Sequence, residues 1–572
     1  MQLTLIAVTC VISIVVVAAF ARQIGVASPL ILVVAGGAMS LLPSIPDFQV
    51  EPEWILAGVL PPLLYAAAVH IPAQDFRRDF KAIAGLAVLL VAVTTLCSGL
   101  MFSILLPGLG LAAAFALGAV ISPTDAVAAT AVGKRLGLPS RLLTILEGEG
   151  LVNDASALVL LSSAVAAMGA TVHPLHVGGE FVYSVACAVL VGVVVGIVNV
   201  RVRALLNDNV LNTAISFVVP FLAFVPAEEL HASGVLAVVV TGLVTGHLSP
   251  RFLRATDRLT EATNWATVAF LLEGGVFLLM GLQVKTVLDE VSEAGLSVRE
   301  AVWIGLLAAV LVIAMRMLFV APLVASLRRD ANRAETMTPV LERMEARAND
   351  PDVDQRFTEK RQQRFLDRIV RKRGDIKFAV AENFGWRGGV VLAWSGMRGA
   401  ITLAAAQSLP TSTPYRAELL LIAFVVAIST LLVQGLSLPF VIRAVRVPGD
   451  DITRDREEFA ELHAELTARA EIVLDDPALA LPDGSAFSDD VVKLVRDELR
   501  TRTVTPEDGE FDSLLDTREQ YRLLRLDVLA AQQSELLDAR SMGLYGSRTL
   551  TRFQRALDIE GARLQQLPGP GD

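Results

Sequence analysis

The most regular feature of this chain is a succession of apolar runs that fills residues 1–445. Most of these runs are long enough to cross a ~30 Å hydrocarbon layer at ~1.5 Å of helical rise per residue. Thirteen runs are found, at 3–20, 26–43, 54–71, 82–106, 110–131, 142–168, 176–200, 210–227, 232–247, 263–284, 300–327, 389–410 and 418–442. The pattern predicts an all-α polytopic membrane domain with about thirteen transmembrane helices.

Two polar segments interrupt or follow this pattern. Residues 328–388 form a charged insertion, in which Phe365 and Ile369 could give an amphipathic helix on the inner leaflet or belong to a solvated linker. Residues 446–572 have the composition of a soluble helical tail. Two stripes of apolar residues are spaced helically along this tail: Phe459, Leu462, Leu466 and Val473, then Leu514, Tyr521, Leu524 and Val528. Regulation, self-association and passive packing remain alternatives for it.

Basic residues are distributed unevenly between the loops. Before the insertion, the loops after odd-numbered runs hold twelve Lys and Arg residues, whereas the loops after even-numbered runs hold three in the whole membrane domain. Because short cytoplasmic loops accumulate basic residues, this bias predicts an N-terminus outside and a tail in the cytoplasm. No basic residue precedes the first run, so we do not expect it to be a cleaved signal peptide.

The composition agrees with a membrane protein, since 53% of residues are hydrophobic, 19% are charged and the mean hydropathy is +0.57. Cys10, Cys97 and Cys187 all lie inside apolar runs and are interpreted as packing residues. The tail contains no phosphate-binding glycine loop, metal-spaced Cys/His cluster or catalytic triad pattern. We therefore expect no enzyme, no cofactor and no nucleic-acid partner.

The sixth run carries three carboxylic acids where lipid would favour apolar residues: Glu147, Glu149 and Asp154. An ionisable residue deep in a membrane costs several kcal/mol, unless it faces a cavity or a partner. Asp154 lies near the middle of the run, which makes it the candidate ion carrier. Glu147 lies close to the inner end, where it could reach water, and its role is left open.

The fifth run supplies a second deep acid, Asp125, close after a proline. Pro123 lacks an amide proton and should open the helix, which frees carbonyl oxygens beside Asp125 and Thr124. Unwound backbone beside a carboxylate forms an oxygen-rich cavity. Such a cavity suits a small hard cation such as Na⁺, so Asp154 and Asp125 are the expected ligands of the transported ion.

The twelfth run places Arg398 between Gly396 and Gly399, which weaken the helix there. Counted from the inner side, Arg398 and Glu149 lie at similar depth, so we expect them to form a buried structural ion pair. The fifth and twelfth runs are both broken and lie seven runs apart. This spacing predicts two inverted six-helix repeats with the site between them.

Several motifs around these residues resemble the monovalent cation/proton antiporter family, which includes bacterial and animal sodium/proton exchangers. They are "SPTDAVAATAVGKRLGLP", "EGEGLVNDA" and "GMRGAITLA", with "LPPLLYAAA", "SGVLAVVVTGL" and "VFLLMGLQV" as further landmarks. The resemblance covers residues 1–445 and does not include the tail.

The resemblance implies a role for each matching residue. Asp154 would bind the transported ion, Asn153 and Thr124 would shape the site, and Asp125 would contribute through water or hydrogen bonds. It also supports the Glu149–Arg398 pair. Three positions depart from the family pattern, namely Gly150, Ala66 and Glu273, and they leave selectivity and kinetics open.

The expected function is secondary active exchange of Na⁺ for H⁺, with Li⁺ as an expected co-substrate and K⁺/H⁺ antiport as the alternative. Cation and proton would compete for Asp154, and Asn153, by the resemblance, implies an electroneutral 1:1 cycle. The family also implies alternating access, with runs four to six and eleven to thirteen moving against one to three and eight to ten, and a homodimer. We expect a bacterial inner membrane location. A cation channel or a membrane sensor is a distant alternative, because no span carries a continuous polar stripe.

Overall fold

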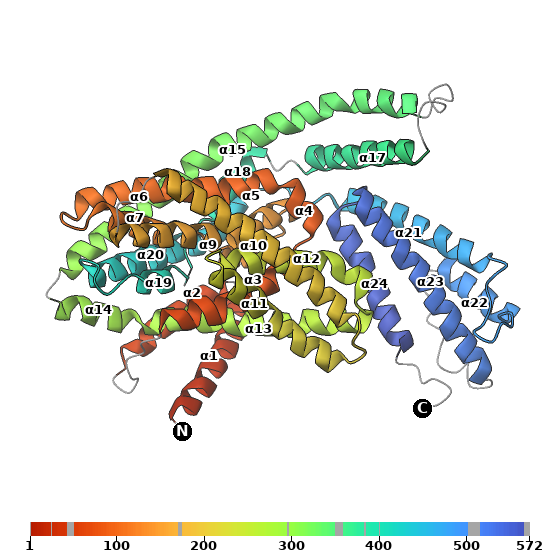
Figure 1. The fold of residues 1–572 in the computed structure, drawn as a ribbon, viewed down its shortest axis with the longest axis horizontal. Helices are drawn as coiled ribbons and strands as arrows, with labels where there is room; N and C mark the ends of the chain where they lie inside the picture. The colour runs from red at the N-terminus through yellow and green to blue at the C-terminus, as the bar shows by residue number, and fades with distance from the viewer. Residues whose placement is uncertain are drawn as a thin grey trace.

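The computed structural model describes residues 2–24, 26–42, 51–169, 174–294, 297–348, 359–382, 385–399, 401–500 and 515–565. All regular secondary structure in these ranges is helical. Figure 1 shows two parts: a large bundle that contains the N-terminal helices, and a smaller group of tail helices packed beside it. The predicted all-α fold is confirmed.

Each predicted apolar run overlaps one or more helices. The helices are α1 (Gln2–Ile24), α2 (Ser28–Ser40), the π-helix η1 (Trp54–Val59) with α3 (Leu60–His70), α4 (Ala73–Arg78), α5 (Phe80–Ala84) with the π-helix η2 (Gly85–Leu90) and α6 (Val91–Leu105), α7 (Leu111–Ile121), α8 (Val127–Leu136), α9 (Ser140–Gly169), α10 (Pro174–Arg203), α11 (Asn209–Glu229), α12 (Gly234–Phe252), α13 (Ala255–Leu282), α14 (Val284–Glu293), α15 (Val298–Ala348), α18 (Gly385–Trp394), α19 (Ile401–Gln407) and α20 (Arg416–Val445).

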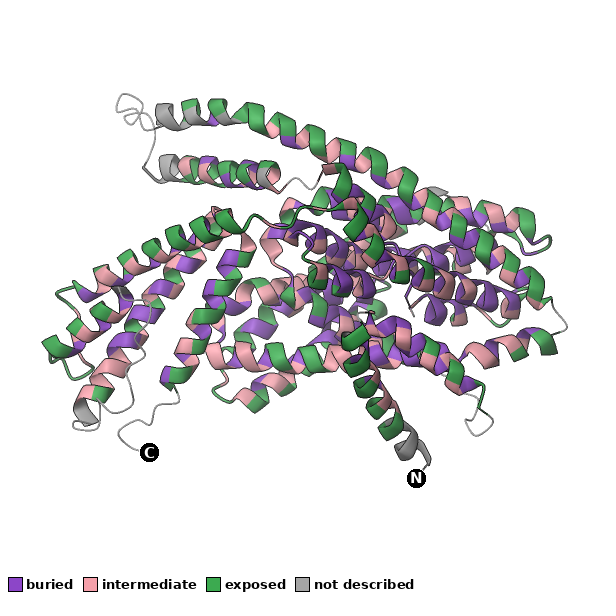
Figure 2. Ribbon diagram, turned by 180° about the vertical axis from the view of Figure 1, so that it is seen from behind, coloured by how far each residue is buried: buried purple, intermediate pink, exposed green. Residues whose placement is uncertain are grey.

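The length and apolar composition of these helices fit a bilayer. Within the described ranges, eight helical segments are long and apolar enough to cross a membrane, and four more apolar helices are shorter. Figure 2 shows buried residues concentrated inside the bundle, whereas α1 is largely exposed. One face of α1 exposes Val8, Ile12, Val16 and Phe20. Exposed apolar residues on long helices are expected where lipid is the solvent. The number of crossings and the inverted repeats stay predictions.

Both predicted helix breaks are present. The fifth run is divided into α7 and α8 by residues 122–126, and the twelfth is divided into α18 and α19. Pro123 explains the first break because it cannot donate a backbone hydrogen bond. In the second break the backbone approaches its neighbours closely: a Cβ on Gly396 would lie 2.3 Å from Arg316 Cδ. Glycine is therefore needed there on steric grounds.

In its described residues the charged insertion is helical, and most of it lies outside the bundle. Helix α15 continues beyond the predicted run, and α17 (Glu359–Ala381) runs back alongside it (Figure 1). Ile369 is buried, whereas Phe365 is exposed. The segment therefore forms a helix with one buried face, whereas its placement on the inner leaflet stays a prediction. Its buried face includes Phe378, and the Arg78 guanidinium lies 4.7 Å from the centre of that ring.

The tail contains four helices in its described residues: α21 (Ile452–Leu474), α22 (Asp489–Arg500), α23 (Leu515–Met542) and α24 (Ser547–Gln565). Leu462 and Leu466 of the first predicted stripe are buried, as are Leu524 and Val528 of the second. Leu514, also part of the second predicted stripe, lies outside the described residues.

The tail is docked on the bundle by specific polar contacts. Arg258 of α13 forms an ion pair with Asp558 of α24, with an Nε to Oδ2 distance of 3.1 Å. Arg78 Nη2 donates to the carbonyl of Gly543 at 2.7 Å, and Gln533 Nε2 donates to the carbonyl of Pro250 at 2.7 Å. These contacts join the end of the bundle that holds α4 and the start of α13 to helices α23 and α24.

Glu382 lies between α17 and α18, and its ionisation should weaken the packing of the segments around it. Burial raises the pKa of Glu382 to about 8, and the nearby Asp75 and Asp450 carboxylates add to the effect against the opposing charges of Arg141 and Arg454. The neutral carboxyl is therefore favoured when these segments are packed. Stability from this group is present at low pH and lost as the pH rises through about 8.

We expect hydrogen–deuterium exchange in α17 to increase between pH 7 and pH 9, after correction for the intrinsic exchange rate. Glu382→Gln should remove much of this increase, because the amide stays neutral. Glu457→Gln, at an exposed position of α21, is the matched control and should behave as wild type. An unchanged pH dependence in Glu382→Gln would show that another group is responsible.

Candidate ion-binding site

The two helix breaks meet each other in the middle of the bundle. The backbone amide of Asp125 donates a hydrogen bond of 2.7 Å to the carbonyl of Met397, which joins the break in the fifth run to that in the twelfth. Asp125 Oδ1 also accepts from the amide of Val127 at 2.8 Å, at the start of α8. The Asp125 carboxylate is thereby held at the N-terminus of a half-helix.

Arg398 satisfies carbonyl groups that the breaks leave without helical partners. Its guanidinium donates to the carbonyls of Ile121 at 2.9 Å and Ser122 at 3.2 Å, and also to that of Gly396. Ile121 and Ser122 end α7, where the last carbonyls of a helix carry partial negative charge. Among the described residues, the buried Arg398 guanidinium forms hydrogen bonds with these carbonyls and with no carboxylate.

The predicted Glu149–Arg398 ion pair is therefore wrong, because Glu149 is bonded to a different arginine. Arg316 of α15 forms a two-pronged ion pair with Glu149, with Nη2 at 2.8 Å from Oε2 and Nη1 bonded to Oε1. Both side chains are 2% exposed. Depth in the bilayer and the family resemblance had both favoured Arg398 as the partner. The lone basic residue in the middle of the run 300–327 was the signal for Arg316 that the sequence reasoning missed.

The Glu149–Arg316 pair is connected to the break beside Asp125. Thr124 Oγ1 donates to Glu149 Oε1 at 2.7 Å. Asn153 Nδ2 donates to the carbonyl of Thr124 at 2.7 Å and to its Oγ1 at 2.9 Å. Asn153 is fully buried. Its side-chain amide therefore connects α9, at the position before Asp154, to the unwound segment that contains Thr124.

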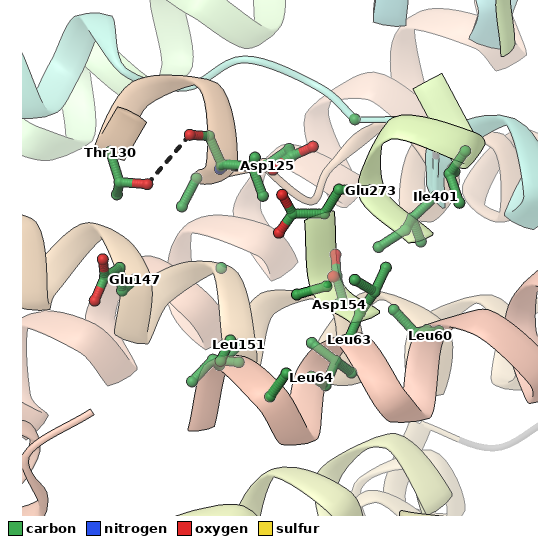
Figure 3. A pocket seen from close by; sticks show the side chains of 18 of the residues that line it. Leu60, Leu63, Leu64, Asp125, Thr130, Glu147, Leu151, Asp154, Glu273 and Ile401 are labelled. Carbon is green, nitrogen blue, oxygen red and sulfur yellow. Dashed lines mark hydrogen bonds between the residues drawn. The ribbon is translucent and has the colours of Figure 1, made fainter. Parts of the chain in front are cut away.

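Three carboxyl groups converge on one cavity of about 530 Å³. Asp125 comes from the first break, Asp154 from α9 and Glu273 from α13, and Figure 3 shows all three directed into the same space. Thr124 also lines the cavity. The structure thus brings together Asp154, Asp125 and Thr124, as predicted, and adds Glu273, whose role the sequence left open. Carboxylate, hydroxyl and carbonyl oxygens are ligands that hard cations prefer.

Glu147 belongs to the outer part of this cavity. It forms an ion pair with Lys134 at 2.7 Å, and its side chain is 28% exposed. Figure 3 shows it set apart from Asp154. The sequence left open whether Glu147 reaches water, and the structure places its side chain partly in contact with solvent.

The close crossing of the breaks depends on Gly399. A Cβ at this position would lie 2.3 Å from Asp125 Oδ2 and 2.7 Å from Asp125 Cβ. We expect Gly399→Ala to destabilise the protein by about 1–3 kcal/mol through overpacking, and to displace Asp125. Thermal unfolding and vesicle transport assays would measure the two effects.

Gly275→Ala is the matched control for this substitution. Gly275 lies on α13, and a Cβ there would meet nothing within 4 Å among the described residues. The control should keep both stability and transport. Wild-type behaviour of Gly399→Ala would show that the crossing tolerates a side chain.

Two broken helices that cross beside buried carboxylates define an ion-coupled secondary transporter. The comparison with protein families agrees with this class. Residues 10–444 match the model of the sodium/hydrogen exchanger transmembrane family, and the chain belongs to this family. It is a multi-pass membrane transporter and not an enzyme.

Individual relatives extend the comparison. An uncharacterized Na⁺/H⁺ exchanger of Mycobacterium tuberculosis is 30% identical, over 97% of this chain and 95% of the relative. A sodium, potassium, lithium and rubidium/H⁺ antiporter of Bacillus subtilis is 32% identical, over 46% of this chain and 40% of the relative. Among solved structures, the sodium proton antiporter MjNhaP1 of Methanocaldococcus jannaschii superimposes with a TM-score of 0.54 at 16% identity, over 78% of this chain and 99% of that chain. The structural likeness supports the fold.

Proposed function

We propose that this protein exchanges Na⁺ for H⁺ across a cell membrane, one for one, by alternating access. The observation that carries the proposal is the convergence of Asp154 and Asp125 on one cavity beside two crossed helix breaks. The family to which the chain belongs supports Na⁺ as the cation.

In the proposed cycle, Asp154 holds either the cation or a proton. Both occupants neutralise the carboxylate, and a neutralised site can cross the low-dielectric interior at lower cost than an empty, charged one. Asp125 and Thr124 supply further oxygen atoms, while Asn153 keeps the unwound segment in position through its two bonds to Thr124. Asn153 is neutral, which supports an electroneutral cycle.

Further features of the proposal concern the assembly and the membrane. We propose that the protein lies in the inner membrane of a bacterium. On the basis of the loop charges, we also propose that its N-terminus lies outside and its tail in the cytoplasm. We also propose the homodimer, and motion of runs four to six and eleven to thirteen as one body, from the family resemblance.

K⁺/H⁺ exchange is the second candidate function. The name of the Bacillus subtilis relative includes potassium, lithium and rubidium beside sodium. The cavity also carries Glu273 in addition to the two aspartates, and an extra carboxylate can change the preference among monovalent cations.

The test is the collapse of a pH gradient in inside-out vesicles on addition of Na⁺, Li⁺ or K⁺ separately. We expect a response to Na⁺ and Li⁺ that does not change when the membrane potential is clamped at zero. A response to K⁺ alone would support the second candidate. A cation current without proton movement would contradict antiport and favour a channel.

A further inference from the structure

A second cavity, of about 850 Å³, lies between the membrane helices and the tail. Its walls come from α3, α4 and the segment that joins them, from α10, α12, the start of α13 and α17, and from the tail helices α23 and α24. Among the described residues, it shares only His70 with the lining of the ion-binding cavity. Nothing proposed above uses it.

The walls of this cavity are of two chemical kinds. The side formed by α10 and α12 is mainly apolar, with lining residues Val193, Ile197, Leu243, Val244 and Leu248, although α12 also contributes His247 and Ser249. The other side is basic and carries the four arginines Arg77, Arg258, Arg371 and Arg540. A ligand that fills the cavity must therefore combine an apolar portion with a negative charge.

The positive charge of the basic wall is only partly compensated by protein acids. Glu261, the one acid among the described lining residues, accepts two bonds of 2.9 Å from the buried Arg203. Asp558 is bonded to Arg258, and Asp375 Oδ1 lies 3.6 Å from Arg77 Nη2. Over the part of the chain that the structure describes, the guanidinium groups of Arg371 and Arg540 form neither a salt bridge nor a hydrogen bond. Burial, together with the charge of Arg258, lowers the pKa of Arg540.

An unsatisfied polar atom also lies in this lining. Gln554 is 7% exposed, and its Nε2 donates to Asp558 Oδ1 at 2.9 Å. Its Oε1 is buried and has no donor among the described residues. A buried acceptor without a donor is unfavourable, and a ligand hydroxyl that donates to it would relieve this cost.

We propose that this cavity binds an anionic phospholipid whose headgroup carries hydroxyl groups. The phosphate would lie among Arg258, Arg371 and Arg540, a headgroup hydroxyl would donate to Gln554, and an acyl chain would run along the wall of α10 and α12. Basic pockets between membrane helices on one side of the bilayer are suited to anionic headgroups.

Two observations favour a lipid over a soluble anion or the transported ion. The apolar wall belongs to helices of the membrane bundle, and Ile197 is exposed on the surface of α10, where a lipid can enter from the side. A wall on which Arg371 and Arg540 have no acidic partner among the described residues repels cations, so the cavity is unsuited to be a path for Na⁺. Because the headgroup would touch α13, α17, α23 and α24, the lipid would join the tail to the membrane domain.

The experiment is native mass spectrometry of the delipidated, full-length protein in detergent, titrated with phosphatidylglycerol or with phosphatidylethanolamine. We expect preferential binding of phosphatidylglycerol. Arg371→Gln with Arg540→Gln should weaken this binding about thirtyfold, from ~1 kcal/mol for each lost arginine. Arg371→Lys with Arg540→Lys keeps the charge and should retain most of it, which separates lost charge from misfolding.

The matched control is Arg555→Gln with Arg563→Gln, at two exposed positions of α24 outside the cavity. This double variant should bind phosphatidylglycerol as wild type does. Equal binding of the two lipids by wild type, or equal loss in the control, would overturn the proposal. Displacement of the lipid by millimolar inorganic phosphate would also overturn it and assign the site to a soluble anion.

Discussion

Asp154→Asn should reduce cation-dependent proton exchange to the level of vesicles without the protein, while the protein still folds and inserts. The amide keeps the shape of the side chain, but it can neither take up the proton nor neutralise the cation. Asp154 lines the cavity and is 8% exposed. The measurement is the collapse of a pH gradient in inside-out vesicles at saturating Na⁺.

Glu147→Gln is the control for the loss of a carboxylate from the same helix. Glu147 lines the same cavity, but it is partly exposed and paired with Lys134. We expect this variant to keep exchange, with at most a change in apparent affinity. Exchange above background in Asp154→Asn would contradict a cycle in which this one carboxylate carries both ions.

Arg316→Met should destabilise the protein by about 3–5 kcal/mol, because it leaves the Glu149 carboxylate charged and without its partner inside the membrane domain. The substitution keeps much of the side-chain volume, so the effect reports mainly on the lost ion pair. Thermal unfolding of the purified protein in detergent would measure the loss. Glu149→Gln should be less harmful alone, since an amide can still accept the bond from Thr124.

A double-mutant cycle tests whether Arg316 or Arg398 is the partner. Glu149→Gln combined with Arg316→Met should recover part of the stability lost in Arg316→Met, whereas Glu149→Gln combined with Arg398→Met should be nearly additive. The reverse result would restore the pairing expected from sequence depth. Transport by the same variants would show whether the pair also supports the site through Thr124.

The sequence predicted the positions of the helices well because apolar length and local breakers act over short distances. Pro123 in the fifth run, and Gly396 with Gly399 in the twelfth, located both breaks, which the structure places at 122–126 and after Trp394. The approach of Asp154 and Asp125 was also expected, because the sequence places both acids deep in their runs at similar height. The amphipathic helix α14 had no place in the predicted pattern, because its apolar face is too short to register as a span.

Partner choice could not be predicted in the same way. Depth along a helix gives the height of a residue in the bilayer but not the direction of its side chain around the helix axis. Glu149 and Arg316 are separated by 167 positions, and only the packing of α9 and α15 around the second break brings them together. The partners of the Arg398 guanidinium are backbone carbonyls, and a comparison of side-chain charges along the sequence does not include them.

Helix α15 gives the buried ion pair a mechanical connection to the surface. It is one helix from Val298 to Ala348. The helix that carries Arg316 inside the bundle therefore also packs against α17 outside the bundle. From Arg316 to Leu341, ~1.5 Å of rise per residue spans roughly 38 Å. A spin or fluorescent label near the C-terminal end of α15, paired with one on α21, would therefore report rearrangements at the Glu149–Arg316 pair from a position outside the bundle.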